Sequence, residues 1–484
     1  MSDLLRESKS ACPYCGTGCG VIVQARGNQI VGVRGDPTHP ANLGKLCPKG
    51  QTLHLTATQD VLARARLLHP QLRDSRAAPR RRVGWDAALD HAADRFAQVL
   101  RERGPDAVAF YVSGQLLTED YYVFNKLARA VVGTNNIDSN SRLCMSSAVV
   151  GYKRTLGADA PPCSYEDLEL ADCVFVAGAN PAAAHPVLFG RLLEAKRRRG
   201  TRLIVADPRR TESAAAADLH LPVRPGTDLW LFTAMLGVML RDGLVNDSFI
   251  AEHTEGFEPV AALARQLALA DAQRITGVPA PDLERAARWF ARAPAALSLY
   301  CQGLNQSTHG TDNNAALIHL HLATGQIGRA GAGPFSLTGQ PNAMGGRETG
   351  TMATLLPGHR DPMDQADRID LARRWGVDTL PARRGLSAVE MFDACANGDI
   401  GALWIACTNP AQSLPDLARV HAALRRVPFV VVQDAFANTE TAVFADLLLP
   451  AATFGEREGT STNSERRITL SRAAVEALGA ARAD

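Results

Sequence analysis

The sequence lacks any long apolar run and any excess of one charge. Its 484 residues include 52 lysines and arginines against 50 aspartates and glutamates, so the net charge of +2 indicates no nucleic-acid partner. No stretch approaches the roughly 20 apolar residues that cross a bilayer, and we expect no membrane partner. The N-terminus has neither an apolar run after a basic start nor twin arginines, which predicts a cytoplasmic protein.

Cysteine is also scarce, and two common nucleotide loops are missing. Ten cysteines are too few for a disulfide scaffold in a chain of this length. The apolar segments that read as strands are followed by neither a GxGxxG nor a Walker A loop. NAD or ATP bound in the usual way is therefore not expected.

Four of the cysteines form one pattern near the N-terminus. Cys12, Cys15, Cys19 and Cys47 read C-x2-C-x3-C-x27-C, a grouping of three plus one. Zinc sites usually pair their ligands two and two, whereas a cubane takes three thiolates from a tight loop and a fourth from elsewhere. The spacing favours a [4Fe–4S] cluster over structural zinc. Between the ligands, alternating apolar residues around Gly27-Asn28 predict a β-hairpin.

Two distant segments have the same sequence plan. Each has an apolar strand ending in Asn-Pro, a helical segment and a second apolar strand, and each continues as T-E-x-A-x-x-A-D-L-x-L-P, from Thr211 and from Thr439. Strand–helix–strand units predict parallel sheets with right-handed crossovers. We therefore expect an α/β protein in which a nucleotide-binding half is duplicated, with two similar ligands.

The expected ligand sites lie at the carboxyl ends of these strands, where open parallel sheets bind ligands. The strands end in "GANP" and "ADPRR" in one half, and in "CTNP" and "QDAFANTE" in the other. An aspartate there, such as Asp207 or Asp434, accepts hydrogen bonds from a ribose or a guanine edge. The alternative is that these residues only form turns.

Cys144 stands apart from the other cysteines. It follows an Asn/Ser-rich loop and precedes a helical stretch, and a thiol near a helix N-terminus is a better nucleophile or soft-metal ligand. The alternative is a buried free cysteine. We apply that second interpretation to the remaining five, Cys163, Cys173, Cys301, Cys395 and Cys407.

Lys49 is either a surface charge or a group between the cluster and its electron partner.

Together these motifs resemble a known family. The cluster motif with Lys49, the segment "NSRLCM" and the paired halves are similar to the molybdenum oxidoreductases that bind two molybdopterin guanine dinucleotides. Within that superfamily, "SRLCMSSAVVGYKRTLGADAPPC" and "GQPNAMGGRETG" resemble catalytic subunits of assimilatory nitrate reductases. The implied cofactors are a [4Fe–4S] cluster and Mo-bis(molybdopterin guanine dinucleotide).

The resemblance also implies roles for particular residues. Cys144 would be the molybdenum ligand, Lys49 would bridge the cluster to one pterin, and Met145, Met344 and Arg347 would shape a nitrate pocket. Gln115 and Asn140 would touch the cofactor near the metal. One dinucleotide would bind Gly178, Ala179, Asn180, Pro181, Asp207, Pro208, Arg209, Gly226, Thr227 and Asp228. The other, or its pyrophosphate, would bind Gln302, Gln306, Asn409, Gln433, Asp434 and Arg457.

The expected domain plan has an N-terminal iron–sulfur domain with β-hairpins and two pseudo-repeated parallel-sheet βαβ domains. The segments are 1–60 for the cluster, 61–165 with 305–385 for molybdenum and the substrate funnel, 166–300 for the first dinucleotide and 386–484 for the second. Members of the family continue with a domain that closes over both dinucleotides. We expect that this domain is absent here, so that either the sequence is a fragment or part of the cofactor cleft is open. Residues 471–484 read as a short amphipathic helix.

The predicted function is the two-electron reduction of nitrate to nitrite in the cytoplasm. Electrons would come from a donor protein, either a flavoprotein, a ferredoxin or a flavodoxin. One alternative is a molybdenum formate dehydrogenase, although that group usually has histidine after the metal-binding residue, where this chain has Met145. A second alternative is a molybdenum-free iron–sulfur electron-transfer subunit.

Overall fold

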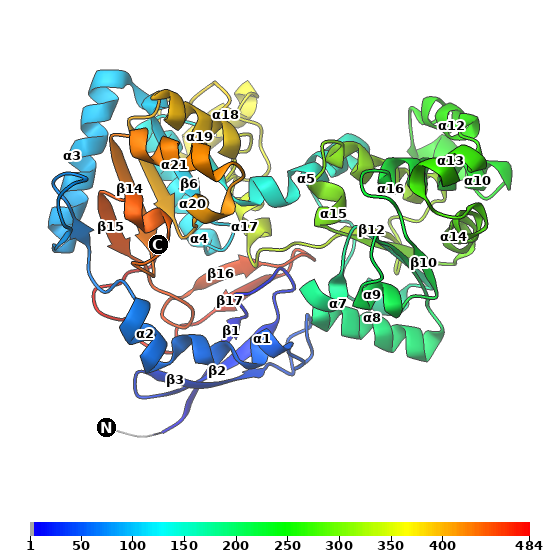
Figure 1. Cartoon of the computed structure of the whole chain (residues 1–484), viewed down its shortest axis with the longest axis horizontal. Coiled ribbons are helices and arrows are strands. Elements are labelled where there is room, and N and C mark those ends of the chain that lie inside the picture. Colours follow the sequence, from blue (N-terminus) through cyan, green and yellow to red (C-terminus); the bar gives the residue numbers. More distant parts are fainter. Residues whose placement is uncertain (1–3) are drawn as a thin grey trace. The chain divides into compact units, whose positions relative to one another are not determined.

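The computed structural model describes residues 4–484, and the chain divides into two compact units. Unit 1 comprises the residues up to Leu143 with Gln340–Asn463 and Ile468–Asp484, and unit 2 comprises Cys144–Gly339 with Ser464–Arg467. Each unit has a largely parallel sheet covered by helices (Figure 1), which confirms the predicted α/β class. In the part of the chain that the structure describes, no helix is long and apolar enough to cross a membrane.

The N-terminal part of unit 1 is a three-stranded antiparallel sheet. Strand β2 (Gly20–Arg26) pairs with β1 (Arg6–Ala11) on one side and with β3 (Gln29–Gly35) on the other. Arg26 pairs with Gln29, so Gly27 and Asn28 form a two-residue turn, and Gly27 has φ +55°. The predicted hairpin is therefore confirmed. Three short helices follow: α1 (Pro48–Gln51), η1 (Leu53–Ala57) and α2 (Gln59–Ala65).

The main sheet of unit 1 has seven strands, of which five adjacent strands run parallel to one another. In spatial order they are β5 (Arg81–Arg82), β4 (Gln71–Leu72), β15 (Leu447–Pro450), β14 (Phe429–Asp434), β13 (Ala402–Ala406), β6 (Val108–Val112) and β7 (Ile137–Ser139).

Helices cover both faces of this sheet. Because successive side chains of a strand point to opposite faces, Val430 and Val432 enter one core and Val431 the other. The first core includes Phe392 of α19 and Leu424 of α21, and the second includes residues of α3 and α4. The helices of unit 1 are α3 (Trp85–Arg103), α4 (Thr118–Lys126), η3 (Leu127–Val132), α17 (Ala343–Glu348), α18 (Gln365–Trp375), α19 (Ala388–Asn397), α20 (Pro410–Ser413), α21 (Leu417–Arg426) and η4 (Thr441–Phe444). A small hairpin, β16 (Gly459–Thr462) with β17 (Ile468–Ser471), completes it.

Unit 2 contains a five-stranded, wholly parallel sheet. Its spatial order is β10 (Leu219–Leu221), β9 (Arg202–Ala206), β8 (Cys173–Ala177), β11 (Ala296–Tyr300) and β12 (Gly333–Ser336). Strands β8 and β11 are buried along their whole length, as expected for strands covered on both faces.

The helices of unit 2 lie on both sides of its sheet. Phe232 of α10, Phe290 of α14 and Leu317 of α16 share one core with Phe175 of β8. Figure 1 shows α7 and α8 on the opposite side from these helices. The helices are α5 (Ser141–Leu156, shared with unit 1), α6 (Asp167–Leu170), α7 (Pro181–Ala184), α8 (Pro186–Arg199), α9 (Glu212–Ala215), α10 (Asp228–Arg241), α11 (Asp247–His253), α12 (Phe257–Gln266), α13 (Leu269–Thr276), α14 (Ala280–Arg292), α15 (Gln302–Asn305) and α16 (Gly310–Ala323).

Both sheets contain a point at which the strand order reverses. In unit 2 the chain runs from β8 outward to β9 and β10, and then returns to β11 on the other side of β8. In unit 1 the same reversal lies between β13 and β6. Crevices at the carboxyl ends of strands beside such a reversal are the usual ligand sites of open α/β sheets.

One predicted element is wrong. The helix expected over 471–484 does not form, because the backbone of this segment pairs with other parts of unit 1 instead. Ala474 N donates to Gly455 O at 2.8 Å, and Ala480 N donates to Leu68 O at 2.7 Å. The predicted four-segment domain plan is a finer division than the two units, and it stays a prediction.

Candidate functional site

The four N-terminal cysteines approach one another in unit 1. Cys12, Cys15 and Cys19 lie in the loop between β1 and β2, and Cys47 immediately precedes α1. The loop is closed by Cys12 N, which donates to Cys19 O at 2.8 Å. Burial raises the pKa of the Cys12 thiol to about 12, and the nearby Cys15 and Cys47 raise it further. The thiols are thus within each other's electrostatic range.

Lys49 lies on α1, two residues after Cys47. Its Nζ is 5.9 Å from the centre of the Tyr14 ring, and Tyr14 stands between Cys12 and Cys15 in the cysteine loop. This cation–π contact ties the lysine to the loop. The predicted bridging role of Lys49 therefore concerns a side chain that is already fixed beside the cysteines.

At the strand-order reversal of unit 1, Gln115 follows β6 and Asn140 follows β7. Asn140 follows β7; its Oδ1 accepts a hydrogen bond from Gly114 N at 2.7 Å, and its Nδ2 donates to Thr408 Oγ1 at 3.3 Å. One amide thus links the ends of β7, β6 and β13. The neighbouring Gln340 has a buried Oε1 that forms no hydrogen bond in the described chain. A polar ligand at this edge would satisfy it.

Arg457 lies on the same side of unit 1, beside a small cavity. The cavity, of about 70 Å³, is lined by Cys12, Gln115 and Arg457 among others, so it joins the cysteine loop to the end of β6. Arg457 Nη1 donates to Asp120 Oδ2 at 3.0 Å and also contacts the Asp484 carboxylate. Burial raises the pKa of Asp120 to about 7, while Arg457 opposes the shift.

The other predicted residues of unit 1 gather at the ends of β13 and β14. Asn409 Oδ1 accepts hydrogen bonds from Thr441 N at 3.1 Å and Thr441 Oγ1 at 2.7 Å. Gln433 Nε2 donates to Asp484 Oδ1 at 2.9 Å. Burial raises the pKa of Asp434 to about 6. Together these side chains form a polar edge above two buried strands.

The short helix α17 carries Met344 and Arg347. Both side chains are buried, and Arg347 Nη1 lies 3.1 Å from Met344 Sδ. The loop after α17 is anchored by Arg129, which is itself fully buried. Arg129 Nη1 donates to Gly350 O at 2.9 Å, and its Nη2 donates to Met352 O at 2.9 Å and to Leu355 O at 2.7 Å. Burial lowers the pKa of Arg129 to about 9.

In unit 2, Cys144 and Met145 lie in the first turn and a half of α5, where both are buried. Gln302 Nε2 donates a hydrogen bond to Cys144 Sγ at 2.7 Å. Gln302 directly follows Cys301, whose thiol contacts Gln302 Oε1 and lies 3.1 Å from Leu337 O. Burial raises the pKa of Cys301 to about 12, and Cys144 adds to the shift.

The loops predicted to bind the first dinucleotide also meet in unit 2. Gly178, at φ +57°, follows β8, and its carbonyl oxygen accepts a hydrogen bond from Gly303 N at 2.9 Å. Asp207 follows β9 and Asp228 begins α10. Burial raises the pKa of Asp228 to about 6, with a further contribution from Asp207. The ends of β8, β9 and β11 therefore form one polar edge at the strand-order reversal.

The remaining predicted residues lie in the loops that follow the strands or at the ends of helices. Asn180 Oδ1 accepts from Ser213 Oγ at 2.6 Å, and Gln306 N donates to Gln302 O at 2.8 Å. Gln302 begins α15 and Gln306 follows its last residue, and both belong to unit 2. Asn409, Gln433, Asp434 and Arg457 belong to unit 1. The other members are Ala179 and Pro181 beside Asn180, Pro208 and Arg209 after β9, and Gly226 and Thr227 before α10.

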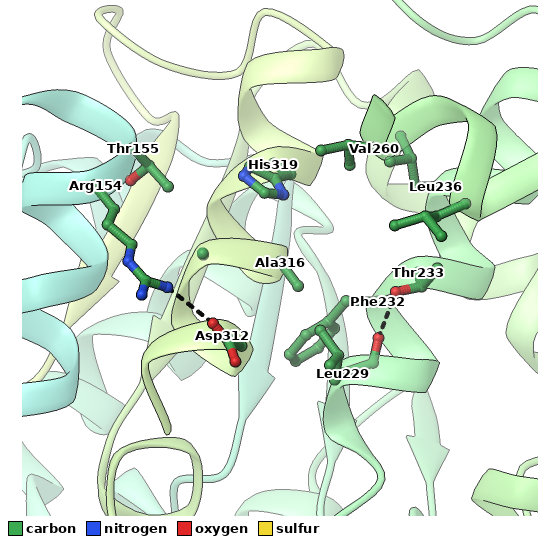
Figure 2. A pocket seen from close by; sticks show the side chains of 12 residues that line it. Arg154, Thr155, Leu229, Phe232, Thr233, Leu236, Val260, Asp312, Ala316 and His319 are labelled. Carbon is green, nitrogen blue, oxygen red and sulfur yellow. Dashed lines mark hydrogen bonds and ion pairs between the residues drawn. The ribbon is translucent and has the colours of Figure 1, made fainter. Parts of the chain in front are cut away.

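Unit 2 also has a larger cavity, of about 440 Å³, between α5, α10, α12 and α16 (Figure 2). Its floor is apolar, with Phe232 and Leu236. Its charged groups are already paired, since Arg154 Nη1 lies 2.9 Å from Asp312 Oδ1. Cys144 does not line it. The cavity thus lacks the thiol and the strand ends that define the predicted site.

Sequence reasoning missed three contributors. Asp120 holds Arg457, Gln340 presents a buried oxygen, and Cys301 was treated only as a buried thiol. Asp120 and Gln340 have no pattern that distinguishes them from other polar residues. Cys301 had one usable signal, because it adjoins Gln302 at the end of an apolar strand.

Comparison with known proteins defines the class of this arrangement. The family described as Molybdopterin oxidoreductase matches residues 66–484, and the Molybdopterin oxidoreductase Fe4S4 domain matches residues 5–58. The chain belongs to the molybdopterin oxidoreductase family. Its cofactors are accordingly a molybdenum-bound molybdopterin and a [4Fe–4S] cluster. Among the described residues, no group of three or more His, Cys, Asp or Glu side chains could hold a metal ion as they stand.

Several relatives are nitrate reductases. The "Nitrate reductase" of Klebsiella oxytoca is 47% identical over 99% of this chain, and that of Synechocystis sp. is 44% identical, also over 99%. The chain spans 54% and 68% of their respective lengths. Acetylene hydratase from Pelobacter acetylenicus has the same fold, with a TM-score of 0.78 at 22% identity over 99% of this chain and 67% of that one.

Two further relatives bear other names. The "Periplasmic nitrate reductase" of Desulfovibrio desulfuricans is 40% identical over 98% of this chain and 64% of its own length. The "F420-dependent formate dehydrogenase subunit alpha" of Methanocaldococcus jannaschii is 36% identical over 98% of this chain and 68% of its own. The family therefore includes more than one reaction.

The residues present fit the two cofactors. Four thiols from a glycine-rich loop and a nearby helix start match the needs of a cubane. The buried Oε1 of Gln340 and the polar strand ends of both units suit large polar ligands. A thiolate is a suitable ligand for a soft metal, and Cys144 lies beside Gln302 near the end of β11 in unit 2.

Proposed function

We propose that this chain reduces nitrate to nitrite, with Cys144 as the protein ligand of molybdenum. The observation that carries the proposal is the place of Cys144 in unit 2, where it is buried and contacts Gln302 at the end of β11. Relatives named nitrate reductase, 44–47% identical, support the substrate. Nitrate takes two protons and two electrons and yields nitrite and water. When bound, the molybdenum cofactor would accept the oxygen atom.

We assign the surrounding residues accordingly. Cys12, Cys15, Cys19 and Cys47 hold the cluster that delivers electrons, and Lys49 lies on its path. Arg347 attracts the nitrate anion, because a guanidinium forms paired hydrogen bonds with planar oxyanions. Met145 and Met344 provide apolar walls. One guanine dinucleotide binds the polar edge of unit 2, from Gly178 to Asp228, and the other binds that of unit 1, with Asn409, Gln433, Asp434 and Arg457.

We further propose an assimilatory role in the cytoplasm. The "Assimilatory nitrate reductase catalytic subunit" of Bacillus subtilis is 36% identical over 98% of this chain. No disulfide joins the ten cysteines in the described chain, as expected in a reducing compartment. The electron donor would be a flavoprotein, a ferredoxin or a flavodoxin. The periplasmic relative defines the alternative location.

The test compares two buried cysteines of unit 2 in the holoenzyme. Cys144→Ser should abolish nitrate reduction and lower the molybdenum content, while the iron–sulfur signal remains. Cys163→Ser is the matched control and should retain all three. Near-normal nitrate reduction in Cys144→Ser would refute the ligand role.

Formate oxidation is the second candidate, since a formate dehydrogenase subunit is among the relatives. Both substrates should be tested with the same holoenzyme and a redox dye. Turnover of nitrate but not formate supports the proposal, and the reverse result overturns it. Metal analysis separates the third candidate, a molybdenum-free electron-transfer subunit, against which the family match over residues 66–484 also argues.

A further inference from the structure

In unit 2, Cys144 is linked to Gln302, and Gln302 to Cys301, in a short row of contacting side chains. Gln302 Nε2 donates to Cys144 Sγ at 2.7 Å. The oxygen of the same amide accepts from the Cys301 thiol, and Leu337 O, 3.1 Å from that sulfur, is a second acceptor for the same S–H group. The order is Cys301, Gln302, Cys144, and the row lies between the ends of β11 and α5.

The direction of the amide follows from its neighbours. An amide has an accepting and a donating end, and a thiol can donate where a metal-bound thiolate can only accept. The Cys301 S–H therefore suits the oxygen of Gln302, which leaves its N–H facing Cys144. A hydrogen bond to an ionised acceptor is stronger than one between neutral groups.

The backbone fixes this row in place. Gly303, next to Gln302, donates to Gly178 O at 2.9 Å, and a Cβ at Gly303 would lie only 2.6 Å from Gly178 Cα. The loop that carries Gln302 is therefore in backbone contact with the loop after β8. On another side, a Cβ at Gly339 would lie 3.5 Å from both Cys144 Sγ and Gln302 Nε2. The sulfur is thus bordered by an amide and by a glycine backbone.

We infer that Gln302 is a positioning residue for the metal ligand, and that Cys301 orients Gln302. The N–H···S hydrogen bond holds the sulfur and withdraws electron density from it. Such hydrogen bonds to sulfur ligands tune the reduction potential of a metal centre. Residues that contact the ligands but not the metal commonly supply them. This inference rests on the proposed role of Cys144.

The first experiment removes the donor in the holoenzyme. Gln302→Leu has no polar end, and Gln302→Glu keeps the shape but loses the N–H group. Both should shift the Mo(VI)/Mo(V) midpoint potential, followed by electron paramagnetic resonance, to more negative values. Both should lower kcat about 10-fold or more with little change in KM for nitrate. Gln266→Leu, at an exposed position on α12, is the control and should change neither quantity. An unchanged potential in both Gln302 variants would overturn the inference.

The second experiment tests the orienting role of Cys301. Cys301→Ala should shift the potential in the same direction as Gln302→Leu, whereas Cys301→Ser retains a donor and should restore it. Cys163→Ala removes a different buried thiol of unit 2 and should have no effect. Equal potentials in Cys301→Ala and Cys301→Ser would show that the donor on residue 301 does not orient the amide.

The third experiment needs no metal. In the cofactor-free chain with ¹⁵N-labelled glutamine, the side-chain signal of Gln302 is assigned by its absence in Gln302→Leu. Cys144→Ala should move this signal, and Cys163→Ala should not. An unmoved signal refutes the contact. If the signal moves but Cys144→Ser retains molybdenum and activity, the proposed function fails while the contact stands, so the two failures are distinguishable.

Discussion

The two repeated halves of the chain form the same turn with different neighbours. In unit 2, Asn180 precedes α7 and receives the hydroxyl of Ser213, and its Nδ2 donates to Glu212 at 3.1 Å. In unit 1, Asn409 precedes α20 and receives the hydroxyl of Thr441, and its Nδ2 donates to Glu440 at 2.5 Å. The shared Asn-Pro and Thr-Glu motifs thus encode one local structure twice.

The difference lies two residues before each asparagine. Gly178 has φ +57° and Cys407 has φ +54°, so both positions require the left-handed region. At Gly178 the backbone of residues 303–304 leaves no space for a side chain, whereas Cys407 carries a thiol whose sulfur lies 3.1 Å from Asp484 Oδ1. At the same position of the turn, a neighbouring backbone segment packs against Gly178 in unit 2, whereas a side chain is present at Cys407 in unit 1.

The largest expected effect comes from comparing the stability of the Gly178→Ala variant with that of the Cys407→Ala variant. A Cβ at Gly178 would lie 2.6 Å from Leu304 N and 2.8 Å from Gly303 C. Left-handed strain and overpacking should each cost on the order of 1–3 kcal/mol, and the free energy of unfolding should fall accordingly. Cys407→Ala adds no atoms and should cost less. Urea denaturation measures both, and equal losses would show that the close backbone approach in unit 2 is not what distinguishes the halves.

The pH dependence of stability tests the comparison further, because it depends on a buried histidine that belongs to unit 2. His321 is fully buried, with Nε2 2.7 Å from Ser298 Oγ, and burial lowers its pKa from 6.5 to about 3. The unfolded chain therefore binds a proton at a higher pH than the folded chain. Between pH 6.5 and about 3, this residue should lower stability by about 1.4 kcal/mol per pH unit. His321→Gln should be less stable at neutral pH but should lose stability less steeply on acidification. His253→Gln, at an exposed histidine, should keep the wild-type slope.

The smallest expected effect comes from the turn that the halves share. Asn180→Ala and Asn409→Ala each remove the acceptor of one buried hydroxyl, and each should lower the free energy of unfolding by about 1–2 kcal/mol. Similar losses in both variants would confirm that the two turns are equivalent. A loss in one alone would mean that the repeated sequence no longer has the same structural role in both halves.

Much of the fold follows from local patterns. The repeated motif predicted both βαβ units, and the Gly27-Asn28 pair predicted the hairpin, because these signals depend on neighbouring residues. Residues 471–484 have a helical pattern, yet their backbone bonds with Gly455 and Leu68 instead. Tertiary partners outweighed helix propensity there.

The site was predictable only in part. Asn140 and Cys144 were candidates because an Asn/Ser-rich loop and the family motif surround them, and their roles stay predictions. The contact between Gln302 and Cys144 joins residues 158 positions apart, and no periodicity reports it. The partnership of Arg457 with Asp120 likewise arises only when the chain is folded.

Arg129 has a consequence for how this protein can vary. Its guanidinium holds the loop after α17 through the carbonyl oxygens of Gly350, Met352 and Leu355, and not through their side chains. Every amino acid supplies such a carbonyl. Residues 352 and 355 can therefore change identity and still supply this anchor, provided that residue 129 remains arginine. Residue 350 must stay glycine, because its φ is +77° and a Cβ there would lie 2.3 Å from Leu356 C.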